Sequence, residues 1–303
     1  MTGTVRAIDC PNCGAGLDVL GGGRVVTQVC SFCGAALDAA DAYRVLAVYA
    51  GMTRPLSPFR LGMEGEVGGV RWTIVGTLGL VERDGGREWR WCDHMLFSPT
   101  HGYAWLTVED RHTLWTRKVR DWPDGPFLAA AEVERAERRP TRRWRGRTFA
   151  YFATSAWTVD FVEGAFNYRP ARGERGTTVT MLPPGEADAM LAFVAPEGGR
   201  EREVELTRYA PGAAEAFGAQ PPVPDGVHPL QPQEVVPDAR FLQGWFAAMA
   251  VAALAALVLL GDQGPSGPTN RLWLFLAAAA FGAALVYVRK QRARRWAGSD
   301  WAE

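Results

Sequence analysis

The sequence lacks an excess of charge of either sign, since 33 Lys and Arg residues balance 33 Asp and Glu residues. A chain with no net charge has no general electrostatic attraction for nucleic acid or for an acidic substrate. Any such attraction must come from local clusters of charged residues. The first twenty residues also lack the apolar segment of a secretory signal peptide. We therefore expect the amino terminus to stay in the cytosol.

Cysteine is scarce, at five residues, yet four of these form two Cys-x-x-Cys pairs. The stretches CPNCGAGL and CSFCGAAL repeat one pattern, and sixteen residues separate the two pairs. In a reducing compartment such pairs bind metal more often than they form disulfides, and zinc takes four thiolates in a tetrahedron. We predict a zinc ribbon over residues 1–40, with the ligands Cys10, Cys13, Cys30 and Cys33.

Four cysteine ligands leave no open position on the metal, so the predicted ion is structural rather than catalytic. Two interpretations of the ribbon stay open: a metal-stapled mini-domain, or a docking surface for a partner protein. Between Cys10 and Asp38 the only cation is Arg24, which disfavours nucleic acid as the partner.

Residues 45–218 predict a β-rich cytosolic body, so the fold class is mainly β. Short runs of alternating apolar and polar residues are separated by Gly, Pro and Asp. In GEVGGVRWTIVG, for example, Gly68-Gly69 suits a hairpin turn. The spacing of these runs is typical of a small barrel or sandwich. The body is either one barrel or two halves, at residues 55–122 and 145–218.

A proline-rich linker at residues 219–239 precedes two uncharged apolar runs, at residues 241–260 and 272–288. Each run is about long enough to cross a bilayer as a helix, so we predict a two-helix transmembrane hairpin within residues 240–289. The tail at residues 289–303 is basic, which favours the cytosolic side. The protein is expected in a bacterial inner membrane, with both termini in the cytosol.

Cys92 and His94 would share one face of a strand, which invites comparison with a Cys–His nucleophile. The apolar residues around them, such as Trp91 and Met95, instead favour a packing role. An orienting third group and an oxyanion site, which such catalysis requires, are not evident in the sequence. No catalytic or cofactor-binding residue is assigned, and a non-enzymatic role is favoured.

Residues 134–147, ERAERRPTRRWRGR, hold seven arginines and one tryptophan. For a protein held at a bilayer, anionic lipid headgroups are the nearest partner for such a segment. Two other interpretations stay open: a solvated connection between the halves of the body, and a site for single-stranded nucleic acid that involves Arg142 and Arg143.

Several stretches between Phe59 and Phe217 resemble, in order, a bacterial family named DUF4178, a domain of unknown function. They are FRLG, GEVGGVRWTIVG, EWRWCDHMLF, YAWLTVED, FVEGAFNYRPARGE and LTRYAPGAAEAF. VEGAFNYR is similar to the family pattern V-x-G-E-F-x-W-x, with Ala165 where an acid is usual and Tyr168 where tryptophan is usual. The resemblance implies an amino-terminal zinc ribbon and paired carboxy-terminal helices. It also implies gene neighbourhoods with polyamine-synthase-like enzymes, small integral membrane proteins and phage-shock-type membrane-remodelling proteins.

Together these features predict a membrane-anchored, cytosol-facing adaptor or sensor. It would dock partner proteins, or copies of itself, in a membrane-maintenance or polyamine/lipid-modification system. The alternative is a lipid- or polyamine-binding domain or enzyme, with acids such as Glu109, Asp160 and Glu163 in a cleft of the β body. A membrane-tethered nucleic-acid binder is the third interpretation.

Overall fold

The structure is a computed structural model that describes residues 6–185, 187–198 and 200–231, and residues 276, 279–284, 286–287, 290 and 295–301. The chain divides into two units, residues 1–231 with 299–303 and residues 232–298, which are considered separately. Among the described residues, no helix is both long and apolar enough to cross a membrane. The predicted span at 241–260 lies outside the described residues, and the span at 272–288 is described only in part.

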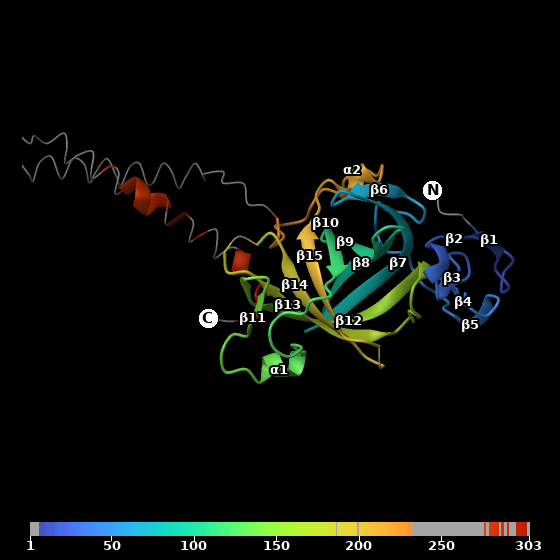
Figure 1. The fold of residues 1–303 in the computed structure, drawn as a ribbon, viewed down its shortest axis with the longest axis horizontal. Coiled ribbons are helices and arrows are strands. Elements are labelled where there is room, and N and C mark those ends of the chain that lie inside the picture. Colours follow the sequence, from blue (N-terminus) through green and yellow to red (C-terminus); the bar gives the residue numbers. More distant parts are fainter. Residues whose placement is uncertain are drawn as a thin grey trace, which may run out of the picture. The chain divides into compact units, whose positions relative to one another are not determined.

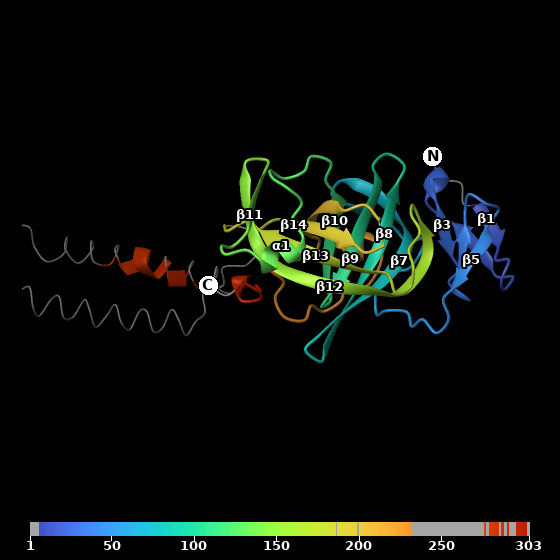
Figure 2. The same cartoon turned by 90° about the horizontal axis from the view of Figure 1, so that it is seen from below.

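Eight antiparallel strands of the first unit close into one barrel (Figure 1; Figure 2). Neighbours pair in the order β12-β13-β14-β15-β10-β9-β8-β7, and β7 pairs with β12 to complete the ring. The strands are β7 (Val70–Asp84), β8 (Arg87–Ser98), β9 (Gly102–Glu109), β10 (His112–Lys118), β12 (Arg147–Phe166), β13 (Arg175–Leu182), β14 (Met190–Pro196) and β15 (Glu203–Tyr209). The prediction of a mainly β protein is confirmed, and the body is a single barrel to which both halves contribute strands.

Strand β8 illustrates why these residues form a barrel wall. Successive side chains of a strand point to opposite faces, so Trp91 and Asp93 line the barrel interior while Cys92 and His94 are buried on the outer face. The β7–β8 turn places Gly85 and Gly86 at φ values of 54° and 78°, which glycine adopts freely and which suit a two-residue hairpin turn.

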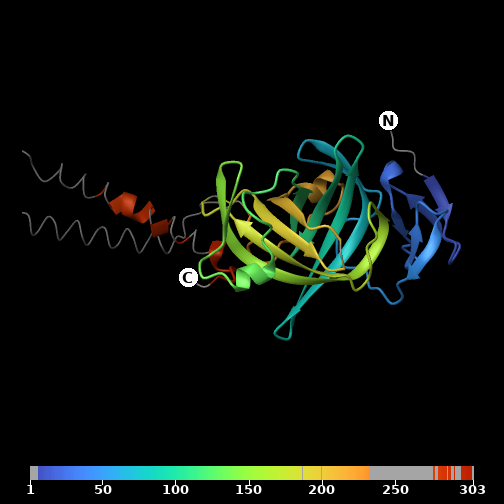
Figure 3. The same cartoon turned by 60° about the horizontal axis from the view of Figure 1, so that its bottom comes forward.

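Strand β12 is the longest strand and curves along the barrel (Figure 3). After its first residues, it pairs with β13, then with β7, and finally with β3 (Thr27–Val29). At Gly164 φ is 89°, and a Cβ atom there would collide with the carbonyl oxygen of Val75. The VEGAFNYR stretch is therefore the place where β12 passes from the barrel wall to the amino-terminal module, and glycine is the residue that permits the passage.

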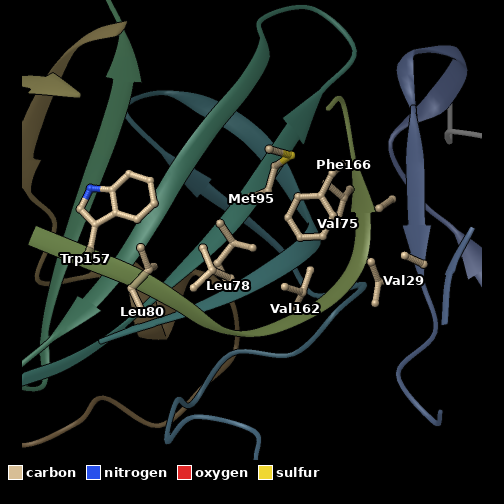
Figure 4. Packing of buried hydrophobic residues seen from close by; sticks show 11 residues of the cluster. Val29, Val75, Leu78, Leu80, Met95, Trp157, Val162 and Phe166 are labelled. Atoms are coloured by element: carbon tan, nitrogen blue, oxygen red, sulfur yellow. The ribbon is translucent and has the colours of Figure 1, made fainter. Parts of the chain in front are cut away.

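The amino-terminal module extends the barrel sheet. Its strands β1 (Arg6–Asp9) and β2 (Gly16–Val19) form a separate pair, whereas β3, β4 (Ala35–Asp38) and β5 (Arg44–Val48) continue the sheet from β12. Val29 of β3 belongs to the same buried cluster as Val75, Val162 and Phe166 of the barrel (Figure 4). The module and the barrel consequently share this cluster, while the module has a second one around Leu17 and Leu37.

The remaining elements cover the outside of the barrel. They are η1 (Gly22–Arg24), β6 (Glu64–Val67), α1 (Ala130–Glu134), β11 (Thr141–Trp144) and α2 (Ala213–Ala216). Strand β6 pairs with β7, and β11 pairs with β12. A second core cluster includes the fully buried Phe59 and Trp72 together with Phe217 after α2. These outer layers leave the interior of the barrel available for polar side chains.

Candidate functional site

The four predicted metal ligands come together in the amino-terminal module. The sulfur atoms of Cys10, Cys13, Cys30 and Cys33 all lie within 4.8 Å of one another. Two tight turns form this arrangement: the N–H of Gly14 donates to the Cys10 carbonyl at 2.8 Å, and the N–H of Gly34 donates to the Cys30 carbonyl at 2.9 Å. Four sulfur ligands at this spacing can hold a metal ion.

A second candidate site is the barrel interior, or lumen, a cavity of about 680 Å³. Acidic side chains line it in unusual number: Glu82, Asp84, Asp93, Glu109, Asp110, Glu174, Glu205, Asp225 and Asp300. Six aromatic side chains contribute as well: Trp89, Trp91, Trp105, Phe152, Trp157 and Tyr168. The cavity reaches the surface at one end, where Asp84, Asp110, Asp225 and Asp300 are exposed, and we call this end the mouth.

Three lumen acids lie deep in the protein. Burial raises the pKa of Asp93 to about 6, of Glu109 to about 7 and of Glu205 to about 8. The charge of Asp93 adds to the upward shifts of both glutamates, so it lies near each of them. These carboxyl groups therefore change protonation close to neutral pH.

The deep acids also have few partners among the described residues. The Thr107 hydroxyl donates to Asp93 at 2.6 Å, but no described group donates a hydrogen bond to the side chain of Glu109 or Glu205. None of the three forms an ion pair with a described residue. The three side chains are half-buried because they line the cavity, and their remaining acceptor capacity is directed into the lumen.

The aromatic residues provide faces that attract cations. The structure contains an example of this contact, because the guanidinium of Arg200 lies 4.4 Å from the ring centroid of Tyr168. Arg200 also pairs with Glu174 at 2.8 Å, so its charge is already balanced. Trp157 is fixed by a hydrogen bond of 3.0 Å from its indole N–H to the Thr178 hydroxyl.

Of the three acids that the sequence suggested for a cleft, only Glu109 lines the lumen. Asp160 is on the outer surface and pairs with Arg90 at 2.7 Å. Glu163 is 4% exposed and lies outside the lumen, where it pairs with Arg54 at 2.5 Å. The three are not brought together, because Glu109 faces the lumen whereas Asp160 and Glu163 lie on the outer side of the wall.

Cys92 and His94 do share a face, as expected, with 3.3 Å between the sulfur and Nε2. Both are fully buried, and Ser57 lies 2.7 Å from the same nitrogen. Burial raises the pKa of Cys92 well above its ordinary value and lowers that of His94 to about 3. A protonated thiol in a closed environment is a poor nucleophile, so the pair is part of the packed wall.

The arginine-rich segment is partly used in folding. Arg145 pairs with Asp121 at 2.8 Å, and Arg147 pairs with Asp188. Arg142 donates to the carbonyl oxygens of Pro126 and Thr141. These contacts connect β11 to the preceding loop and the start of β12 to the loop between β13 and β14.

Sequence reasoning missed Asp93, Glu205 and Asp300 as lumen residues. A signal for Asp93 exists, because Trp89, Trp91 and Asp93 alternate along one strand and place an acid behind two tryptophans. Glu205 has a similar position in EVELTRY, where it alternates with Glu203 and Thr207. Asp300 gives no local signal, since its place in the lumen depends on contacts with distant residues.

Comparison with known proteins identifies a family. A family model described as a domain of unknown function, DUF4178, matches residues 60–212. No curated protein and no solved structure matches the chain. The matched range begins before β6 and ends just before α2, so it contains all eight barrel strands and excludes the four cysteines.

Proposed function

This chain belongs to the DUF4178 family, and from the chemistry of its barrel we propose that it is a membrane-tethered sensor that binds an organic cation in its lumen. The ligand class that fits is a flexible amine with two or more ammonium groups, such as a linear polyamine. The observation that carries the proposal is a set of lumen carboxyl groups, Asp93, Glu109 and Glu205, that form no ion pair with a described residue and face a cavity lined with tryptophan.

The electrostatic argument rests on the cost of ionising these acids. A carboxylate in a poorly solvated interior is unfavourable unless an opposite charge or hydrogen-bond donors compensate for the lost water. An ammonium group supplies both, since it carries a positive charge and three N–H donors. Ligand binding at neutral pH would therefore release protons from the acids with raised pKa values.

The remaining lining fits the same ligand class. The indole faces of Trp91, Trp105 and Trp157 can contact methylene groups and also attract cationic charge. A volume of about 680 Å³ is within the range of cavities that hold small organic molecules. Acids at several depths, from Asp300 at the mouth to Glu205 inside, suit an elongated cation better than a single compact one.

The decisive experiment is calorimetric titration of the detergent-solubilised full chain with spermidine. We expect saturable binding that weakens at least about tenfold in Asp93→Asn, which removes the charge while preserving size. Asp160→Asn is the matched control, because it removes a surface acid outside the lumen. Equal affinities of the two variants would contradict the proposal. Binding to vesicles of phosphatidylethanolamine, with none to spermidine, would point instead to an aminolipid headgroup.

We also propose that the cysteine cluster holds zinc and that residues 241–260 and 272–288 form the membrane anchor. The preference of zinc for four thiolates supports the first assignment, and the length and apolarity of the two runs support the second. Both termini would then lie in the cytosol. Metal analysis should find one zinc per chain, and a reporter fused after residue 303 should be active on the cytosolic side.

A second candidate function is partner docking through the amino-terminal module. Exposed apolar side chains support it: Phe32 is 75% exposed on the second cysteine turn, and Leu56 is 99% exposed in the loop that leads to the barrel. Such an adaptor would report the state of the lumen to a protein partner. In native membranes, Phe32→Ser should abolish near-stoichiometric co-purification of that partner, whereas retention of the partner would exclude this surface.

A further inference from the structure

Residues at the carboxy terminus return to the barrel after the separate unit at 232–298. The Ser299 hydroxyl donates to the carbonyl oxygen of Phe152 at 2.7 Å, and the backbone N–H of Asp300 donates to the same oxygen at 2.9 Å. The Trp301 ring packs edge-on against Tyr151, with centroids 6.0 Å apart. This short segment is therefore bound to β12 by both polar and apolar contacts.

The Asp300 carboxylate has a defined position at the mouth of the lumen. Its Oδ2 atom accepts hydrogen bonds from the Thr154 backbone N–H at 2.7 Å and from the Tyr151 hydroxyl at 3.2 Å. The two donors occur where β12 shifts register against β13, between Tyr151 and Ala153. Asp300 also lines the cavity; burial raises the pKa of Glu82, and the nearby charge of Asp300 adds to this shift.

The segment that precedes residues 232–298 docks at the same mouth. The Asp225 N–H donates to the Asp110 carbonyl at 2.9 Å, and the His228 ring stacks on Tyr209 at 6.1 Å. Leu230 is 2% exposed, and residues 225 and 227–229 line the cavity. The mouth is consequently built from the barrel strands together with both segments that flank residues 232–298.

We propose, on the basis of the proposed function, that Asp300 is a further amine-binding residue and that the two docked flanking segments complete the lumen site. An amine long enough to reach from Asp93 to the mouth contacts the carboxylate of Asp300, which its two donors already hold in place. Because Asp300 is present only when the carboxy terminus is docked, ligand binding and docking stabilise each other. Thermodynamic linkage requires this coupling to be reciprocal. The lumen thereby controls how firmly residues 225–230 and 299–301 dock at the mouth.

The first test compares Asp300→Asn with wild type and Asp160→Asn in spermidine titrations of the full chain. Asparagine retains the oxygen that accepts from Thr154, so the segment stays docked while the charge is lost. We expect a loss of about tenfold in affinity for spermidine and about threefold or less for the shorter diamine putrescine. An unchanged affinity for spermidine in Asp300→Asn would overturn the inference.

The second test measures hydrogen exchange of the backbone amides of Thr154 and Asp300. We expect saturating spermidine to slow exchange at both amides in wild type, and to do so less in Asp93→Asn. Spermidine binding without slower exchange would show that docking is independent of the lumen and would overturn the coupling.

The two proposals fail in distinguishable ways. If Asp93→Asn abolishes binding while Asp300→Asn binds as wild type does, the lumen is an amine site without Asp300. If wild type binds no amine, the proposed function and this inference both fall.

Discussion

The outer and inner faces of β8 both carry ionisable side chains, and the surroundings of these side chains differ between the two faces. On the outer face, His94 lies 2.7 Å from the Ser57 hydroxyl and 3.1 Å from the Thr77 hydroxyl, and Thr77 in turn contacts Glu163, which pairs with Arg54. On the inner face, Asp93 has a single hydroxyl donor. The outer groups contact one another inside the packed wall, whereas the lumen acids form no ion pair with a described residue and line a cavity, which indicates a binding site.

The largest effect should come from breaking the ion pair between Arg54 and Glu163 on the outer face of the wall. Arg54→Met leaves Glu163 buried without its partner, and we expect the free energy of unfolding to fall by about 2–3 kcal/mol. Chemical denaturation monitored by circular dichroism measures the loss. Arg90→Met is the control, because it breaks the exposed pair with Asp160 and should cost no more than about 1 kcal/mol. Equal losses in the two variants would remove the distinction between the outer network and the surface.

An intermediate effect should come from pH. The pKa values of Asp93, Glu109 and Glu205 are raised to about 6, 7 and 8, so between pH 5 and 8 these groups hold more protons in the folded state than in the unfolded chain. Stability then falls as pH rises through this window. Glu205→Gln should reduce the slope and stabilise the protein at pH 8 by about 1 kcal/mol or more.

The measurement is a series of denaturation midpoints between pH 5 and 8, with and without spermidine. Spermidine should restore part of the stability lost at pH 8, because it compensates for the charges that ionisation creates. If stability falls with pH equally steeply in Glu205→Gln and wild type, ionisation of Glu205 does not destabilise the folded protein.

The smallest effect should come from removing the Thr107 hydroxyl, the hydrogen-bond donor that the described residues provide to Asp93. Thr107→Val removes the hydroxyl that donates to Asp93, and this should raise the pKa of Asp93 further. Spermidine binding at pH 7 should then weaken about two- to threefold. Titrations at pH 7 and pH 8.5 separate the two causes, since a pKa effect shrinks at the higher pH. A loss that is constant with pH would mean that Thr107 contacts the ligand directly.

The local patterns of the sequence predicted strands and turns well, because alternation and glycine pairs act within a few residues. Gly68 and Gly69 form the expected hairpin turn between β6 and β7, and the four cysteines gather as their spacing indicated. Barrel closure was beyond such reasoning, since it depends on pairing between β7 and β12, which are distant in the sequence. A propensity argument contains no information on that register.

The lumen could be predicted only in part for the same reason. Glu109 was a candidate, but whether an acid faces the lumen or the outside depends on a single-residue register. Glu163 and Asp160 illustrate this, since both belong to β12 and both lie outside the cavity. The position of Asp300 could not be predicted, because it depends on contacts with Tyr151 and Thr154, which are distant in the sequence.

Gly164 has a consequence for how this protein can be divided. The family match begins at residue 60, yet β12 pairs with β3 directly after this glycine, and Val29 fills the core beside Phe166. A fragment limited to residues 60–212 would expose the edge of β12 and an apolar surface, and is expected to aggregate. The segment that folds as a unit is therefore larger than residues 60–212, which the family model matches. Evolution can transfer only this larger segment between proteins.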